Sequence, residues 1–188
     1  MEWWGNGVNI WGRLRCGGVA AAAVALVCLA QPAAAQITLG SPGDPPHIAV
    51  GAGAFDVTPS SSNKHGGTAA EFRGEYRFGD VGWWFISPFL GVSATSDGAF
   101  YGYGGFGFDI NLSPNWVVTP NGAVGYFGHG SGTNLGSVVE FRTGAEFDYR
   151  FDDLSRLGVN VNHTSNAGIG KHNPGEQSVV LMYSMPLR

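Results

Sequence analysis

Hydrophobic and polar residues alternate beyond residue 46, in stretches of 10 to 14 residues separated by turn-forming clusters. In one stretch Phe72 and Tyr76 share a face, whereas Glu71 and Arg73 occupy the opposite face. Because successive side chains of a strand point to opposite faces, this pattern predicts β-strands. Eight are expected, at residues 47–57, 68–79, 83–95, 99–112, 115–127, 137–151, 155–165 and 177–187.

The number and length of these strands indicate a membrane barrel. An even number of strands returns the chain to the side on which it started, and about 10 residues suffice for a tilted strand to span a bilayer. Aromatic residues gather toward strand ends, as interfacial girdles do: Trp83, Trp84, Phe100, Tyr101, Trp116, Tyr126 and Phe127. We therefore predict an all-β fold, an eight-stranded antiparallel transmembrane β-barrel with charged residues inside and aromatic residues facing lipid.

The N-terminal third predicts export rather than a helical anchor. Arg13 and Arg15 precede an apolar run at residues 19–30, and three alanines at 33–35 then offer a cleavage site. The run is too short to span about 30 Å of hydrocarbon as a helix. The expected organisation is a secretory signal peptide at residues 1–35, a Pro/Gly-rich N-terminal tail at 36–46 and a barrel at 47–188, with a hairpin at 155–187.

The composition restricts the possible disulfides and binding partners of the protein. Both cysteines, Cys16 and Cys28, lie in the expected signal peptide, so the exported chain cannot form disulfides. Without Glu2, Arg13 and Arg15, 8 of the 10 basic and 13 of the 14 acidic residues remain, for a formal charge of −5. This balance argues against nucleic acid as a partner. The expected location is the outer membrane of a Gram-negative cell.

The seventh expected strand carries candidate chemistry. His163 and Ser165 fall on the same face as Leu157, Val159 and Val161, the face predicted to meet lipid. Polar side chains facing hydrocarbon are costly and therefore suggest function. An imidazole that accepts the serine proton turns a weak nucleophile into a catalytic one. From the two-residue spacing alone, polar residues at the aqueous rim of a barrel are the favoured interpretation.

The sequence around these residues resembles that of the lipid A 3-O-deacylase (PagL) family. The resemblance is carried by His163-Thr164-Ser165-Asn166-Ala167-Gly168, by Asn173-Pro174-Gly175 and by Met185-Pro186-Leu187. Further upstream it is general: a signal peptide, Gly53-Ala54-Phe55-Asp56 and eight strands. It implies an eight-stranded outer-membrane barrel that hydrolyses the ester-linked 3-hydroxyacyl chain at the 3-position of lipid A. The implied Ser–His–Glu triad lies outside the barrel, near the extracellular rim.

The resemblance also implies roles for individual residues. His163 is the expected general base and Ser165 the nucleophile, while Asn166 and Gly168 stand where the family forms its oxyanion hole. Asn173 matches a family asparagine in the following turn. The implied substrate is lipid A or lipopolysaccharide among the outer-membrane lipids, and no metal or organic cofactor is expected.

The third member of the triad is ambiguous. Without gaps, the family's glutamate falls on Gln177, and Glu176 stands one position earlier. If the last two strands pair about Gly170, Gln177 lies opposite His163 and Glu176 points into the barrel. A one-residue bulge at Gly175 would exchange the two. Gln177 is the favoured equivalent, and Glu176 remains an alternative.

The other histidines do not suggest a second site. His47, His65 and His129 share no ligand spacing, which argues against a metal site, and Lys171 and His172 could meet anionic lipopolysaccharide or simply be solvated. A non-enzymatic structural or adhesive barrel and a soluble periplasmic lipid carrier are the competing functions. The sequence leaves the oligomeric state open, a homodimer included.

Overall fold

The structure, a computed structural model, describes residues 37–59, 67–82 and 85–187. The expected signal peptide at residues 1–35 lies outside these ranges. Among the described residues, no helix has the length and apolar character needed to cross a membrane. The strands are β1 (Thr38–Leu39), β2 (His47–Phe55), β3 (Ala69–Arg77), β4 (Ile86–Thr95), β5 (Phe100–Phe108), β6 (Ile110–Asn111), β7 (Trp116–Gly128), β8 (Val139–Arg150), β9 (Arg156–Ser165) and β10 (Glu176–Pro186).

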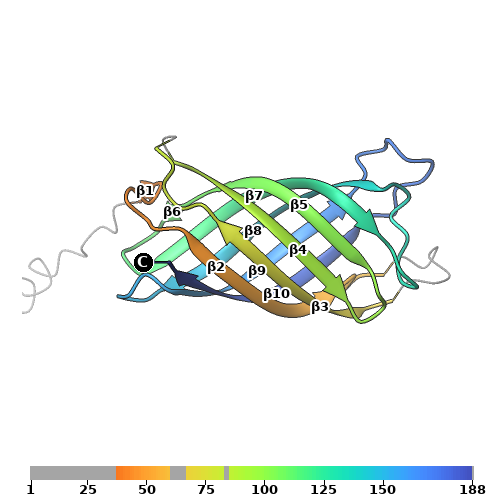
Figure 1. Cartoon of the computed structure of the whole chain (residues 1–188), viewed down its shortest axis with the longest axis horizontal. Coiled ribbons are helices and arrows are strands. Elements are labelled where there is room, and N and C mark those ends of the chain that lie inside the picture. The colour runs from red at the N-terminus through yellow and green to blue at the C-terminus, as the bar shows by residue number, and fades with distance from the viewer. Residues whose placement is uncertain (1–36, 60–66, 83–84, 188) are drawn as a thin grey trace, which may run out of the picture. The chain divides into compact units, whose positions relative to one another are not determined.

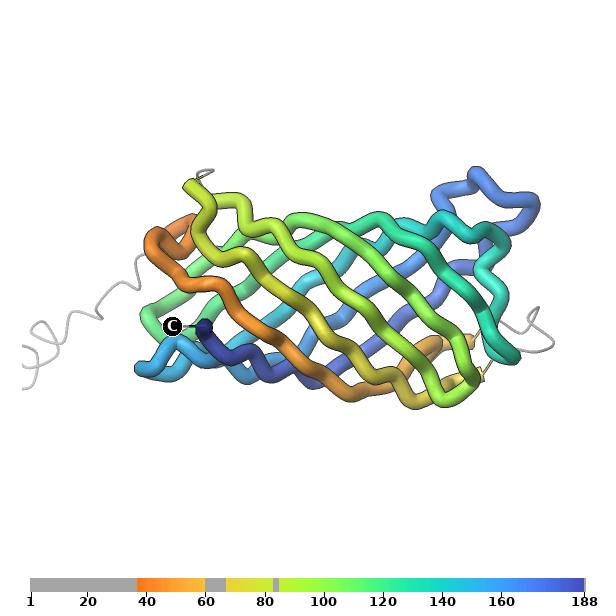
Figure 2. Tube along the Cα trace, in the orientation of Figure 1, coloured from red at the N-terminus to blue at the C-terminus, as the bar shows by residue number. Residues whose placement is uncertain are grey.

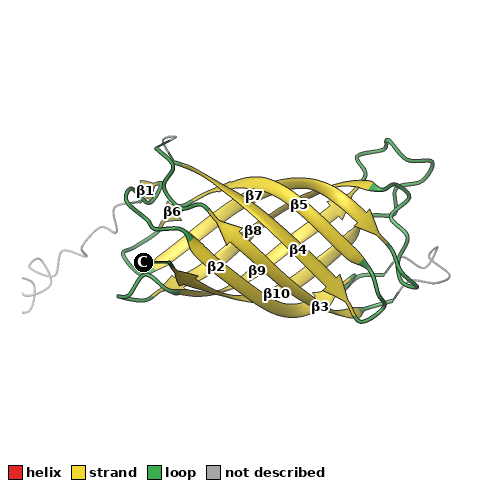
Figure 3. Ribbon diagram, viewed as in Figure 1, coloured by secondary structure: helices red, strands yellow, loops and turns green. Residues whose placement is uncertain are grey.

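Eight of these strands close into an antiparallel barrel. Their order is β7-β5-β4-β3-β2-β10-β9-β8, and pairing between β7 and β8 completes the ring. The strands wrap diagonally around the barrel axis, as Figures 1 and 3 show. The eight-stranded barrel is therefore confirmed, and all eight expected strands correspond to observed ones.

Two short strands modify one end of the barrel. The expected strand 99–112 breaks at Asp109, and its continuation β6 pairs with β7 through Ile110 and Val118. Leu39 of β1 then pairs with Ile110 on the other side of β6. The backbone N–H of Gly40 donates to the carbonyl of Asp109 at 2.7 Å. Part of the segment expected as a tail is thus attached to the sheet.

Charged side chains point into the barrel, and large apolar side chains point out. On β3, Glu71 and Arg73 are 2% and 5% exposed, whereas Phe72 between them is 62% exposed. The same division recurs on β8, where Glu140 is fully buried and Phe147 is exposed. This polarity is the reverse of a soluble lipid-carrying barrel and matches a barrel surrounded by lipid.

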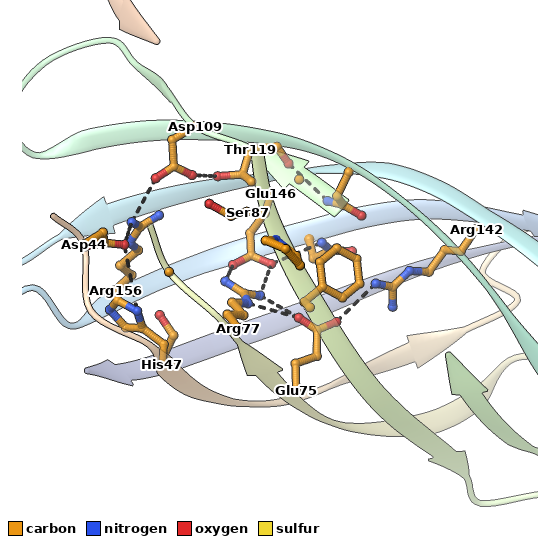
Figure 4. Close-up of a pocket in the computed structure, with 17 residues that line it drawn as sticks. Asp44, His47, Glu75, Arg77, Ser87, Asp109, Thr119, Arg142, Glu146 and Arg156 are labelled. Carbon is orange, nitrogen blue, oxygen red and sulfur yellow. Dashed lines mark hydrogen bonds and ion pairs between the residues drawn. The ribbon is translucent and has the colours of Figure 1, made fainter. Parts of the chain in front are cut away.

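Ion pairs lie in the interior, as Figure 4 shows for Arg77, Glu75 and Glu146. Arg77 pairs with Glu75 at 2.9 Å and with Glu146 at 2.8 Å, and Arg142 reaches Glu75 at 3.1 Å. The hydroxyl of Tyr103 donates to Glu75 at 2.8 Å. The cavity that remains among these residues has a volume of about 50 Å³. The lumen is a packed polar core without room for a lipid.

The two ends of the barrel differ. The tail and the C-terminal end of β10 lie at one end, and the loops 129–138 and 166–175 extend from the other (Figure 2). In outer-membrane barrels the longer loops are extracellular. The loop 129–138 folds inward, because Leu135 is fully buried and packs in a cluster with Phe55 and Phe127. Leu135 therefore covers the lumen at this end.

Candidate active site

The candidate catalytic residues lie at the extracellular end of β9. Along this strand Leu157, Val159, Val161 and His163 are exposed, and the residues between them are buried. Ser165, the last residue of the strand, is half-buried on the same face. His163 and Ser165 therefore share the lipid-facing surface, as the alternation predicts.

Gln177 is the neighbour of His163 on the next strand. The two residues are direct partners in the ladder between β9 and β10, so the strands pair about residue 170 as expected. The side-chain nitrogen Nε2 of Gln177 lies 3.1 Å from Nδ1 of His163. Within the described residues Nε2 of His163 has no hydrogen-bond partner and is open to a substrate or to Ser165.

Glu176 lies on the other side of the barrel wall. It is 1% exposed, and its Oε2 accepts from the hydroxyl of Ser178 at 2.8 Å and from the backbone N–H of Asp56 at 3.4 Å. The ladder runs without interruption through Glu176, which pairs with Thr164. The bulge that would exchange Glu176 with Gln177 is absent from this ladder, so the alternative in which Glu176 orients His163 is contradicted by the register.

Gly175 shapes the space around the imidazole. Its φ of +65° lies in the left-handed region, which favours glycine. A Cβ at this position would lie 2.6 Å from Cε1 of His163, closer than real contacts allow. The absent side chain therefore lets the imidazole lie against the backbone where the loop enters β10.

The turn after Ser165 is organised by Asn166. This residue is fully buried, and its Nδ2 donates to the carbonyls of Leu135 and His172, both at 2.8 Å. Its backbone N–H donates to Oδ1 of Asn173 at 3.0 Å, and the N–H of Gly168 donates to Oδ1 of Asn166 at 2.9 Å. The structure thus brings all three expected residues together, with these donors already engaged inside the turn.

Ala167 lies between Asn166 and Gly168, whose backbone N–H groups are both hydrogen-bonded. Ala167 has a φ of +52°, a costly conformation for a residue with a Cβ. In the described part of the chain its N–H makes no hydrogen bond. This N–H is two residues from the Ser165 hydroxyl along the chain, in the region where an oxyanion donor is needed.

An apolar groove begins beside His163 on the outer wall. Its volume is about 420 Å³, and its lining includes Thr143, Gly122 and Phe106. These residues form one cross-strand row with His163: Thr143 pairs with His163, Gly122 with Thr143 and Phe106 with Gly122. Along the row His163, Thr143 and Gly122 lie two, four and six residues from the extracellular ends of their strands. The groove therefore starts one strand from His163, below the rim, and runs deeper along the wall.

The contact between Thr58 and Gln177 could not be predicted from the sequence. The hydroxyl of Thr58 hydrogen-bonds with Oε1 of Gln177, on the side of the amide away from His163. Thr58 is 119 residues from Gln177 and reaches it because β2 pairs with β10. Nothing in the local pattern around Thr58 distinguishes it from an ordinary loop residue.

The remaining candidates are not assembled into a site. His47 is buried in the lumen, where Nε2 lies 3.1 Å from the carbonyl oxygen of Leu154. His129, Lys171 and His172 are exposed on loops, and His65 lies outside the described residues. Among the residues described, no group of three or more histidine, cysteine or acidic side chains could hold a metal ion.

The fold and the site together define a transmembrane barrel with a Ser–His pair on its lipid-facing wall. The family profile of lipid A 3-O-deacylase (PagL) matches residues 83–186, more than half of the sequence, and the chain belongs to this family. The crystal structure of the outer membrane enzyme PagL is similar in fold, with a TM-score of 0.56 and 19% identity over 75% of this chain and 99% of that chain.

A designed protein shares the fold as well. A structure from the de novo design of transmembrane β-barrels has a TM-score of 0.53 and 14% identity, over 80% of this chain and all of that chain. At these identities both structures bear on the fold alone. No curated protein matches the sequence.

Proposed function

We propose that this protein is an outer-membrane serine esterase that hydrolyses the ester-linked 3-hydroxyacyl chain at the 3-position of lipid A. The observation that carries the proposal is the position of Ser165 and His163 on the outer wall, with Gln177 behind the imidazole and Nε2 open in front. Family membership supports the same substrate. Export by a cleaved signal peptide at residues 1–35 is part of the proposal.

The substrate would enter sideways from the bilayer. Lipid A stands in the outer leaflet with its sugars at the extracellular surface and its acyl chains in the hydrocarbon. The groove that starts at Thr143 and descends past Gly122 suits an acyl chain whose ester lies at the rim. Because the chain moves from lipid into an equally apolar groove, its contacts with residues such as Phe106 contribute van der Waals packing rather than transfer from water.

Hydrolysis would proceed in two steps through an acyl-enzyme. Ser165 Oγ attacks the ester carbonyl carbon while Nε2 of His163 accepts the hydroxyl proton. The carbon–oxygen bond to the sugar then breaks, and His163 returns the proton to the departing sugar oxygen. Water, activated by the same imidazole, releases the 3-hydroxy fatty acid and restores Ser165. No step requires a metal or an organic cofactor.

The developing oxyanion needs donors near Ser165. Asn166, Gly168 and Asn173 are proposed for the oxyanion and substrate region, and the N–H of Ala167, between the engaged amides of Asn166 and Gly168, makes no hydrogen bond within the described residues. A preorganised donor of this kind contributes roughly 3 kcal/mol to transition-state stabilisation. Asn166 and Asn173 then hold the turn in place through their mutual hydrogen bond.

Mass spectrometry of lipid A tests the proposal. Cells that produce the protein should yield lipid A lacking one 3-hydroxyacyl chain, and cells that produce Ser165→Ala or His163→Ala should yield intact lipid A. Heat-modifiable migration in gels confirms that each variant is folded. Unchanged lipid A in cells that contain the folded wild-type barrel would contradict the proposal and favour a non-enzymatic structural or adhesive barrel.

A further inference from the structure

Gln177 places an amide where a carboxylate would be expected. Both oxygens of a carboxylate accept hydrogen bonds, so either can hold the Nδ1–H of a catalytic imidazole. An amide has one accepting and one donating end. The imidazole can take the serine proton at Nε2 only when Nδ1 carries hydrogen, so the accepting end of Gln177 must face His163.

The structure shows the amide in the other orientation. Nε2 of Gln177 lies 3.1 Å from Nδ1 of His163, and Oε1 faces the hydroxyl of Thr58. In this arrangement the amide donates to Nδ1, and the imidazole proton resides on Nε2. A half-turn of the amide exchanges its two ends and gives the arrangement that catalysis requires. After this half-turn the amide nitrogen needs an acceptor on the Thr58 side.

Thr58 suits both orientations, because a hydroxyl group donates and accepts. It donates to Oε1 in the observed arrangement and can accept from Nε2 of Gln177 after the half-turn. Lysine or arginine at this position could only donate, and an aliphatic residue could do neither. The hydroxyl therefore keeps the amide directed at His163 in either state, although Gln177 is half-exposed and could otherwise turn toward water.

The backbone near Thr58 is held in place by the lumen. Asp56 has a φ of +53° and is 1% exposed, and its Oδ2 accepts from the hydroxyl of Thr133 at 2.7 Å. The next residue, Val57, donates its N–H to the carbonyl of Gln177 at 2.8 Å. Asp56 thus ties the end of β2 to the loop 129–138 and Val57 ties it to β10, with Thr58 on the outer side next to the amide.

We propose that Thr58 is a positioning residue that keeps the Gln177 amide directed at Nδ1 of His163 in either amide orientation, and so holds the imidazole in place. This inference rests on the proposed esterase function for its kinetic consequence. Its structural consequence, a change at the imidazole, is independent of that function.

The experiment uses the full-length chain folded in detergent micelles, with lipid A as substrate. Thr58→Val should lower kcat on the order of tenfold with little change in KM, the effect of one lost hydrogen bond. Thr58→Ser should restore kcat. The control is Thr68→Val, which removes a hydroxyl from the same loop that donates to the carbonyl of Asp56 and does not contact Gln177.

A second set of variants that carry Gln177→Glu distinguishes positioning of the Gln177 amide by Thr58 from general support of the loop. A carboxylate presents an accepting oxygen in either orientation, so Thr58→Val should cost less in this background than with Gln177 present. Such a difference is the coupling that a double-mutant cycle measures. An equal loss in both backgrounds would mean that Thr58 only supports the loop, and the proposal would be overturned.

A spectroscopic readout keeps this test distinct from that of the esterase function. In protein labelled with ¹⁵N-histidine, the Nδ1 and Nε2 signals of His163, assigned by their loss in His163→Gln, report the tautomer. They should move toward those of a solvent-exposed imidazole in Thr58→Val and return in Thr58→Ser. Signals unchanged in Thr58→Val would overturn the role of Thr58. Absence of hydrolysis by every protein would refute the esterase function alone.

Discussion

At the scale of the residue, two adjacent side chains on β10 have opposite environments. Gln177 meets His163 on the outer wall, and Glu176 is buried in the lumen beside Ser178. The difference follows from the period of two in a strand, which sends neighbours to opposite faces. The charged residue thus lies away from the imidazole, and the neutral one contacts it.

Separate substitutions of these two residues should have unequal effects. Gln177→Ala should lower kcat by about tenfold to a hundredfold, because the imidazole loses its partner at Nδ1 and no longer holds its orientation. Glu176→Gln should keep kcat within about twofold, since the new side chain has the same size and can still accept from Ser178. Release of 3-hydroxy fatty acid from lipid A, followed by mass spectrometry, gives both rates. A larger loss in Glu176→Gln would contradict the register.

At the scale of the element, the β9–β10 hairpin shows how much a sequence can reveal. The alternation predicts that His163 lies on the outer face, and the structure places it there. Symmetry about residue 170 predicts that Gln177 is its partner, and the strand ladder pairs the two residues. Period and register are local properties of a hairpin. Both can therefore be predicted from the sequence without knowledge of the rest of the fold.

Contacts between segments that are distant in the sequence cannot be predicted in this way. Thr58 reaches Gln177 only because the barrel closes β2 onto β10, and Leu135 enters the lumen only because its loop folds inward. The break at Asp109 also has no local signal, because it depends on the attachment of the segment around Gly40. Loop conformation and closure of the sheet decide these contacts, and neither repeats along the chain.

The groove beside the hairpin gives a prediction at the same scale. Gly122 lies in the groove, and a Cβ built there meets only the carbonyl oxygen of Arg142, at an ordinary distance of 3.7 Å. Gly122→Leu should therefore fold and fill the groove. Because the displaced part of the chain returns to lipid rather than to water, only its van der Waals contacts in the groove are lost, and kcat/KM for long acyl chains should fall by about threefold.

A matched control exists on the opposite side of the catalytic strands. Gly74 of β3 lies on the outer wall with nothing within 4 Å of a built Cβ, and it is absent from the groove lining. Gly74→Leu should leave hydrolysis unchanged. Mixtures of lipid A species that differ in acyl length, analysed in one reaction, compare the two variants directly. Equal rates for Gly122→Leu and the wild-type protein on long chains would remove the groove from the binding site.

At the scale of the whole molecule, the barrel divides its tasks between its two faces. The lumen holds paired charges that need one another for burial, and the outer wall carries the serine, the histidine and the groove. No residue of the central ion-pair network lies on the catalytic face. Stability and chemistry should accordingly respond to different substitutions.

Glu75 provides the test of this division. It accepts from Arg77, Arg142 and Tyr103, and the ion pair that the structure gives Arg142 is with Glu75. Glu75→Ala leaves a buried guanidinium without its carboxylate and should lower the free energy of unfolding by about 3 kcal/mol. The temperature at which the folded band is lost in gels measures the change, with the exposed turn residue in Asp152→Ala as the control.

Barrels of Glu75→Ala that remain folded at a lower temperature should hydrolyse lipid A at the wild-type rate, because the packed lumen does not reach the substrate. A proportionate loss of activity in those folded barrels would mean that the interior charges act on the outer site.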